Sequence, residues 1–345
     1  MMISSILFSL FLAFTPCCPI TDVAADDCRY TASFTGVSGD DTRDNDPGSA
    51  IPLAIADPYV IYDGKTGVYY AYGTSAPDGF KAYVSEDLVH WRQADTQLGG
   101  GYVLRKGHSV FGDANFWAPE VWKTGDTYYM LYTADFSLCV ARSSSPLGPF
   151  VQPGEPYCLV QGAIDHTLCI DDATGEYYLC FNATRNGRNS IYMARVEKDF
   201  SSMAPESEWR LCLTTDPGTW EEIQNQIIEG PFIIRHGGRY YLTYSANDYR
   251  SQDYAVGYAV SDTLFPGRWE KAADNPILRR PAGLVGTGHS SFFTGADGQL
   301  YIVFHAHPDR ESYDPRHMYV SRAWIGEDGT LKVAEDCTPA FLIIE

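Results

Sequence analysis

Residues Ile227–Asn247 read IIEGPFIIRHGGRYYLTYSAN, and this stretch contains the pattern that the rest of the chain repeats. One carboxylate, Glu229, stands between apolar residues and a Gly-Pro turn, and a short strand, a Gly-Gly turn and an aromatic strand follow. Apolar neighbours such as Ile228 and Phe232 should exclude water from Glu229, raise its pKa and keep it protonated near neutral pH. A protonated carboxyl group can serve as a general acid, whereas a loop glutamate that faces water is the simpler alternative.

The turn and the aromatic strand of this stretch occur five times along the chain. The copies are DGKTGVYYAYGTS from Asp63, KTGDTYYMLYTA from Lys123, DDATGEYYLCFNAT from Asp171, RHGGRYYLTYSAN from Arg235 and GADGQLYIVFHAH from Gly295. Gaps of 59, 49, 63 and 60 residues separate their aligned tyrosines, Tyr70, Tyr129, Tyr178, Tyr241 and Tyr301. A second strand pattern follows each copy, so each unit offers three or four short strands joined by tight turns.

Units of roughly 50 to 60 residues with about four antiparallel strands are typical of β-propeller blades. We therefore expect an all-β, five-bladed β-propeller over residues 50–345, with its active site in the central channel where the innermost strands meet. A two-sheet sandwich is the alternative, but it does not require so regular a period.

The composition limits the partners of the protein. Its 345 residues carry 25 basic and 44 acidic side chains, a net charge of −19. Such a chain cannot neutralise phosphates, so nucleic acid is excluded as a partner and a neutral substrate such as a carbohydrate fits better.

The amino terminus predicts export. Residues Ile3–Phe14 form an apolar run too short to span a bilayer, and the small residues that end at Ala25 offer a cleavage site, so residues 1–25 are expected to be a signal peptide. A lipid anchor at Cys17 or Cys18 is the alternative. Residues 26–49 are expected to be a polar leader. No second apolar run predicts a membrane span, and the protein is expected to be secreted, periplasmic or at the cell surface.

Removal of residues 1–25 leaves seven cysteines, without the CxxC spacing of a metal site. Cys28 and Cys337 lie near the two mature ends and could join them. Cys169 and Cys180 flank one hairpin turn and are expected to face each other as buried thiols. No disulfide is predicted.

The innermost strand of a propeller blade precedes the other strands of that blade in the sequence. The residues just before each aromatic copy are therefore expected to line the channel. The segments are ADPYV, NFWAPEV, AIDHT, IEGP and GTGHSS. Three of these segments contain an acid, Asp57, Asp165 and Glu229, and the sequence suggests that the three occupy matching positions of the repeat. Burial of a charge without a partner is costly, so three such acids around one repeat indicate a functional site.

The set ADPYV, FWAPEV, IDHTL, IEGPF and GTGHSS with FHAH resembles glycoside hydrolase family 43, the five-bladed-propeller arabinofuranosidases, xylosidases and arabinanases, over essentially the whole mature chain. The resemblance implies hydrolysis of a glycosidic bond with inversion. Glu229 matches the general acid, Asp57 the general base, and Asp165 the carboxylate that orients the acid and raises its pKa. Inversion requires roughly 6.5–9.5 Å between acid and base, which leaves room for a water.

Other residues near these acids have two interpretations each. Phe116 and Trp117 either stack on a sugar ring or pack in the core. Arg316 stands where the family often has a hydroxyl-binding arginine, or is a surface residue. Glu120 is expected to be structural.

The last blade contributes two histidines, His289 and His305, where the family often has a histidine near a central calcium or water cluster. The resemblance implies no required cofactor and allows a structural calcium there; satisfied core histidines are the alternative. His166 stands where the family pattern predicts a proline after Asp165. The sequence therefore does not predict how the pocket is built on the leaving-group side.

The leading hypothesis is a secreted glycosidase that removes terminal α-L-arabinofuranose from plant-type glycans. A β-xylosidase or a galactofuranosidase or exo-galactanase on the same scaffold is the alternative. A non-catalytic glycan-binding propeller is the hypothesis from another class, and the presence of all three acids disfavours it. A phosphorolytic enzyme would need a cluster of basic residues for phosphate near the acids, and the sequence shows no such cluster beside Glu229 or Asp57.

Overall fold

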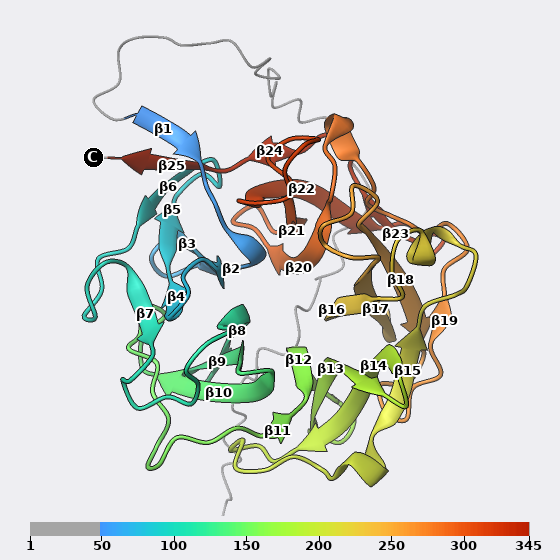
Figure 1. The fold of residues 1–345 in the computed structure, drawn as a ribbon, viewed down its shortest axis with the longest axis horizontal. Coiled ribbons are helices and arrows are strands. Elements are labelled where there is room, and N and C mark those ends of the chain that lie inside the picture. Colours follow the sequence, from blue (N-terminus) through green and yellow to red (C-terminus); the bar gives the residue numbers. More distant parts are fainter. Residues whose placement is uncertain (1–48, 345) are drawn as a thin grey trace, which may run out of the picture.

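The computed structural model of the protein describes residues 49–344. Five antiparallel sheets are arranged around one axis (Figure 1), which confirms the prediction of an all-β, five-bladed β-propeller. The predicted signal peptide, the alternative anchor at Cys17 or Cys18, Cys28 and the leader up to residue 48 lie outside the described residues. In the described part, no helix is both long and apolar enough to cross a membrane.

The blades follow one another along the chain, and each begins with the strand nearest the axis. Blade 1 contains β2 (Ala56–Asp63), β3 (Val68–Thr74), β5 (Tyr83–Ser85) and β6 (His90–Gln93). Blade 2 contains β8 (Trp117–Thr124), β9 (Thr127–Ala134), β10 (Ser137–Ser143) and β11 (Val160–Gln161). Blade 3 contains β12 (Ala163–Ile170), β13 (Tyr177–Arg185), β14 (Arg188–Val196) and β15 (Arg210–Thr214). Blade 4 contains β16 (Ile228–His236), β17 (Arg239–Ala246), β18 (Ala255–Ser261) and β19 (Glu270–Lys271). Blade 5 contains β20 (Gly288–Thr294), β21 (Leu300–Ala306), β22 (His317–Ile325), β23 (Leu331–Val333) and β24 (Thr338–Pro339).

Two strands from the ends of the described chain complete blade 1 at its outer edge. β25 (Phe341–Ile344) pairs in parallel with β6, and β1 (Ser49–Pro52) pairs antiparallel with β25. The ring is therefore closed by backbone hydrogen bonds between the beginning and the end of the described residues. Ser49, assigned to the polar leader from the sequence, already belongs to a strand.

The remaining short elements lie between the blades. They are β4 (Gly79–Lys81), paired with β7 (Tyr102–Arg105), and the 3-10 turns η1 (Glu206–Glu208), η2 (Trp220–Glu222) and η3 (Pro281–Gly283).

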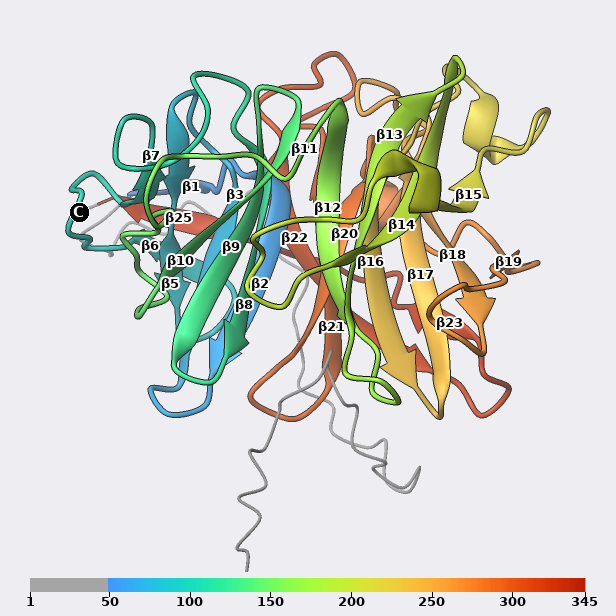
Figure 2. The same ribbon diagram turned by 90° about the horizontal axis from the view of Figure 1, so that it is seen from below.

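Aromatic rings from four innermost strands fill the axis of the propeller. The ring of Phe232 on β16 lies 6.3 Å from Tyr59 on β2, 6.5 Å from Trp122 on β8 and 5.9 Å from Phe292 on β20. Such pairs contribute about 0.5–1.5 kcal/mol each beyond their buried area. These contacts bring inner strands of different blades together, and the strands run roughly along the axis (Figure 2).

None of the six cysteines of residues 49–344 forms a disulfide: Cys139, Cys158, Cys169, Cys180, Cys212 and Cys337. Cys169 and Cys180 are buried, as expected from the sequence, but they do not lie opposite each other: Tyr178 is paired with Cys169 and Thr167 with Cys180.

Candidate active site

The same backbone irregularity occurs in all five innermost strands. Each strand has a β-bulge, in which two of its residues lie opposite one residue of the second strand. The first bulge residue has a positive φ in every blade: Asp57 (51°), Ala118 (44°), Asp165 (53°), Gly230 (55°) and His289 (45°). Bulges redirect side chains, and they are common beside active sites.

This register corrects one detail of the sequence analysis. Asp57 and Asp165 occupy equivalent bulge positions, but Glu229 precedes the bulge of its strand by one residue. Its equivalents in blades 1 and 3 are Ala56 and Ile164. The acid of blade 4 thus approaches the axis from a different backbone position than the other two.

Asp57 is held as an ionised carboxylate. Thr74 Oγ1 donates to its Oδ2 at 2.6 Å, and Arg316 Nη1 donates to its Oδ1 at 3.1 Å. Burial alone would raise the pKa of Asp57, but the positive charge of Arg316, the histidines His289 and His305 and the Thr74 hydrogen bond outweigh it and lower the pKa. A carboxylate that stays ionised at every physiological pH can accept a proton from water.

Glu229 has the opposite electrostatic environment. Burial is the largest cause, and it raises the pKa of Glu229 to about 7 with a further contribution from the charge of Asp57. Tyr254 Oη donates to Glu229 Oε1 at 2.8 Å, and this hydrogen bond together with Arg316 opposes the rise. The expectation of a raised pKa from apolar surroundings is confirmed.

Asp165 completes the group of buried acids. Its backbone N–H donates to Thr133 Oγ1 at 3.1 Å, which ties blade 3 to blade 2. Burial raises the pKa of Asp165 well above its ordinary value, and the negative charges of Glu229 and Asp57 raise it further. Asp165 and Glu229 therefore titrate as a pair that retains a proton near neutral pH.

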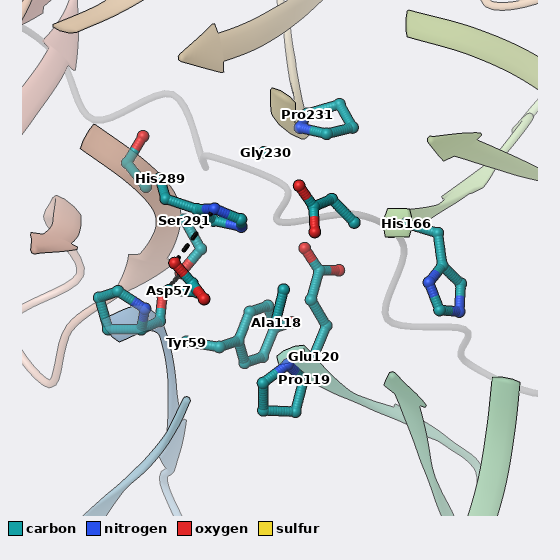
Figure 3. Close-up of a pocket in the computed structure, with 13 residues that line it drawn as sticks. Asp57, Tyr59, Ala118, Pro119, Glu120, His166, Gly230, Pro231, His289 and Ser291 are labelled. Carbon is teal, nitrogen blue, oxygen red and sulfur yellow. Dashed lines mark hydrogen bonds and ion pairs between the residues drawn. The ribbon is translucent and has the colours of Figure 1, made fainter. Parts of the chain in front are cut away.

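The histidines of blade 5 contact the base. His289 Nδ1 lies 3.2 Å from Asp57 Oδ1, and Figure 3 shows the two side chains facing each other. His305 Nδ1 accepts the backbone N–H of Asp57 at 3.1 Å. Burial lowers the pKa of both rings, so both are neutral near pH 7.

The metal role expected of these two histidines is not supported. Because Nδ1 of His305 accepts a hydrogen bond, its ring proton is on Nε2, which leaves no lone pair for a cation. Residues 49–344 also contain no group of three or more His, Cys, Asp and Glu side chains placed to hold a metal ion.

A cleft of about 790 Å³ opens beside Asp57, between blades 1, 2 and 5. We call it the base-side cleft, and its lining includes Thr74, Asn115, Trp117, Asp314 and Arg316. Arg316 is anchored at both ends of its guanidinium, to Asp57 and through Nε to Asp314 at 3.2 Å. It therefore lies inside the site and is not a surface arginine.

The two aromatic residues proposed from the sequence differ in exposure. Trp117 is half-buried and lines the base-side cleft. Phe116 borders the same cleft but is only 1% exposed, and its ring packs on Phe80 at 5.8 Å and on Tyr132 at 6.3 Å. Of the two interpretations of Phe116, core packing therefore fits the structure.

Glu120 and His166 line the central pocket together with Asp57 and Asp165. Figure 3 shows Glu120 pointing into this pocket, with His166 on the side opposite Asp57. Burial raises the pKa of Glu120 to about 8, so it is protonated at neutral pH. The ring of His166 contacts the backbone carbonyl of Cys139 at 3.0 Å through Nε2, and burial lowers its pKa to about 4.

Two contact residues of this site were not identified from the sequence. Thr74 stands at the end of a second strand and Tyr254 in the loop before β18, so neither lies in the innermost-strand segments that the repeat analysis examined. Gly288, the residue before His289, is the sequence feature that corresponds to Tyr254, because the Tyr254 ring leaves no room for a larger residue there. A Cβ on Gly288 would come within 2.3 Å of the Tyr254 ring.

Comparisons with known proteins agree with this geometry. The family model for glycosyl hydrolases family 43 matches residues 50–331. The extracellular exo-alpha-(1->5)-L-arabinofuranosidase ArbA of Cellvibrio japonicus (strain Ueda107) is 24% identical over 306 residues, which cover 79% of this chain and 84% of that protein. The enzyme of the same description from Streptomyces chartreusis is 27% identical, over 74% of this chain and 81% of that protein.

Among solved structures, an endo-1,4-beta-xylanase from Bacteroides thetaiotaomicron VPI-5482 superposes with a TM-score of 0.77 at 35% identity, over 86% of this chain and 99% of that chain. A thermostable family-43 glycoside hydrolase superposes with a TM-score of 0.72 at 34% identity, over 81% and 92%. The match of the family model covers most of the chain. The protein thus belongs to glycosyl hydrolases family 43, whose members are inverting glycoside hydrolases.

Proposed function

We propose that the protein is an exported α-L-arabinofuranosidase that removes terminal arabinofuranosyl units from plant-type polysaccharides or oligosaccharides. The observation that carries the mechanism is the contrast between two carboxyl groups of one channel: Asp57 has a lowered pKa and Glu229 a raised one. Acid and base are then both in their reactive forms near neutral pH.

In the proposed reaction Glu229 gives its proton to the glycosidic oxygen as the bond from that oxygen to the anomeric carbon breaks. Asp57 takes a proton from the water whose oxygen forms the new bond to that carbon on the opposite face. Asp165 shares a proton with Glu229 as a coupled pair, so that one proton remains in the pair near neutral pH until the leaving group requires it. The two carboxyl groups supply both proton transfers, so the reaction needs no cofactor.

Substitution of the acid tests these roles. Glu229→Gln should lower kcat/KM on a glycan, a poor leaving group, by about 100-fold or more, and should spare aryl glycosides whose leaving group needs no proton. Asp57→Asn should abolish both activities. Equal losses on the two substrate types in Glu229→Gln would exclude it as the acid.

The sugar is assigned from the relatives. Proteins described as extracellular exo-arabinofuranosidases match most of this chain, and these names also support action outside the cytoplasm. A second candidate is a β-xyloside, because a structural relative at 35% identity is described as an endo-1,4-beta-xylanase. A galactofuranoside is a third, after the Aspergillus niger beta-D-galactofuranosidase that is 25% identical.

A release assay separates these candidates. Aryl α-L-arabinofuranoside, aryl β-D-xyloside and aryl β-D-galactofuranoside are incubated with the protein, and the Asp57→Asn variant serves as the blank. We expect turnover of the arabinofuranoside only. Turnover of another substrate alone would reassign the sugar, and binding of glycans without any turnover would favour a glycan-binding propeller.

A further inference from the structure

An exposed aromatic side chain, Phe136, stands at the mouth of the propeller in a strained conformation. It is the second residue of the two-residue turn between β9 and β10, and both turn residues, Asp135 and Phe136, have a positive φ, of 47° and 55°. Turns of this kind favour Gly or Asn, and a bulky residue there costs about 1–2 kcal/mol. The side chain is nevertheless 54% exposed, so burial does not compensate for the strain.

A second phenylalanine provides the contrast. Phe200 has a φ of 57° but is only 1% exposed, and its ring packs on Tyr129 at 5.0 Å and on Tyr177 at 6.1 Å. The strain at Phe200 is therefore offset by core packing. Strain at an exposed residue without such compensation points to a functional role.

The turn is fixed in place by its neighbours. The Asp135 carboxylate accepts the backbone N–H groups of Asp113 at 2.8 Å and Ala114 at 2.9 Å. The backbone N–H of Gly162 donates to the carbonyl of Phe136 at 2.8 Å. The aromatic ring is thus presented by a backbone that is attached to the preceding loop and to the connection between β11 and β12.

Phe136 lies next to the base-side cleft, because it contacts Trp117 of the cleft lining. Its ring lies 5.1 Å from that of Trp117 at an angle of 86°, and Trp117 lines the cleft that reaches Asp57 through Thr74 and Arg316. The start of β8 and the β9–β10 turn lie at the same end of blade 2, because the two strand pairs are antiparallel. Two aromatic rings therefore extend from the reacting centre toward the solvent.

We propose that Trp117 and Phe136 form an aromatic platform that binds a further sugar ring of the glycan, next to the ring that is cleaved. The apolar faces of a neutral sugar pack on aromatic rings, and a cleft of about 790 Å³ is large enough for more than one ring. The proposal rests on the proposed glycosidase function. It makes chain length, and not only the terminal sugar, a determinant of the substrate.

The test variant is Phe136→Gly. Glycine suits the positive φ, so the fold should be retained and the melting temperature should stay the same or rise. Values of kcat/KM are measured on the aryl glycoside and on oligosaccharides of two to five units. We expect a loss of roughly fivefold to tenfold on oligosaccharides of three or more units and no change on the aryl glycoside.

Trp324→Ala is the matched control. Trp324 is 46% exposed and lies eight residues beyond Arg316 on β22, roughly 26 Å away along an extended strand. This variant should match the wild type on every substrate. Equal losses of Phe136→Gly on all substrates, or no loss on any, would overturn the platform.

A binding measurement keeps the test independent of the sugar assignment. Calorimetric titration of Asp57→Asn, with and without Phe136→Gly, uses arabino- and xylo-oligosaccharides of two to five units. Weaker binding of the longer chains in the double variant supports the platform even if the proposed arabinofuranosidase activity fails. A wild-type dimer that becomes a monomer in Phe136→Gly would instead identify Phe136 as an interface residue and refute the proposal.

Discussion

At the scale of single residues, Tyr254 controls how strongly Glu229 holds its proton. The phenol is fully buried, donates to Glu229 Oε1, and stacks on His305 with ring centroids 5.8 Å apart. It stabilises the ionised form of the acid, which is the form that remains after the proton has been transferred. Tyr254 is therefore a positioning residue that makes Glu229 a stronger acid than burial alone would allow.

Tyr254→Phe should move the pH dependence of the enzyme. Loss of the hydrogen bond should raise the pKa of Glu229, shift the basic limb of the kcat/KM profile to higher pH, and lower kcat on poor leaving groups by roughly tenfold. The profile is measured between pH 4 and 10. Tyr244→Phe is the control, because that buried phenol on β17 of the same blade donates to Glu221 of η2 at 2.6 Å and not to Glu229. A basic limb that does not move would contradict the role.

How far the sequence determines these residues depends on where they lie in a blade. Asp57, Asp165 and Glu229 lie in innermost strands, and the repeat therefore locates them. Tyr254 belongs to the loop between β17 and β18, and its contact with Glu229 depends on how this loop folds back over the innermost strand of blade 4. Single-sequence periodicity carries no information on such a contact.

At the scale of elements, the bulge of each innermost strand decides which side chains reach the axis. The five aromatic copies predict the strands and their order, and the structure confirms both. The bulges were not predicted, because the pairing of two residues opposite one leaves no mark in the spacing of apolar residues. This is why the sequence suggests that Glu229 matches Asp57 and Asp165 in position, whereas the structure shows Glu229 one residue before the bulge.

Gly230→Ala tests the bulge of blade 4. Gly230 has a φ of 55°, and a Cβ there would approach the His289 ring to 3.0 Å. The ring would be displaced against Asp57, so kcat should fall at least about tenfold while stability falls by about 1–2 kcal/mol. Kinetics and urea unfolding are compared in the same preparations.

Gly238→Ala is the matched control for this prediction. Gly238 has a φ of 78° in the β16–β17 turn, with nothing within 4 Å of an added Cβ. It should show a similar loss of stability with full activity. Equal activity losses in the two variants would mean that backbone strain, and not contact with His289, is responsible.

At the scale of the whole molecule, the ring depends on the pairing of β25 with β6 and β1. Deletion of residues 341–345 should therefore lower the melting temperature by roughly 5 °C or more, because it exposes the outer edge of blade 1 and removes the partner of Trp91. The channel is formed by the opposite edge of that blade, so activity at low temperature should remain. An unchanged melting temperature would show that the ring is closed without β25.

The buried glutamic acids Glu229 and Glu120 contribute stability that is lost as the pH rises. The pKa of Glu229 is raised to about 7 and that of Glu120 to about 8, whereas in the unfolded chain both titrate near 4.5. The folded protein binds more protons than the unfolded chain between these values, so their stabilising contribution is complete below pH 4.5 and is lost by about pH 8. Glu120→Gln should remove the contribution of Glu120 to the pH dependence of the free energy of unfolding, on the order of 2 kcal/mol after allowance for partial exposure. The free energy of unfolding of this variant should therefore change less with pH. Urea unfolding between pH 5 and 9 measures this difference. A variant profile parallel to that of the wild type would mean that Glu120 is ionised in the folded protein.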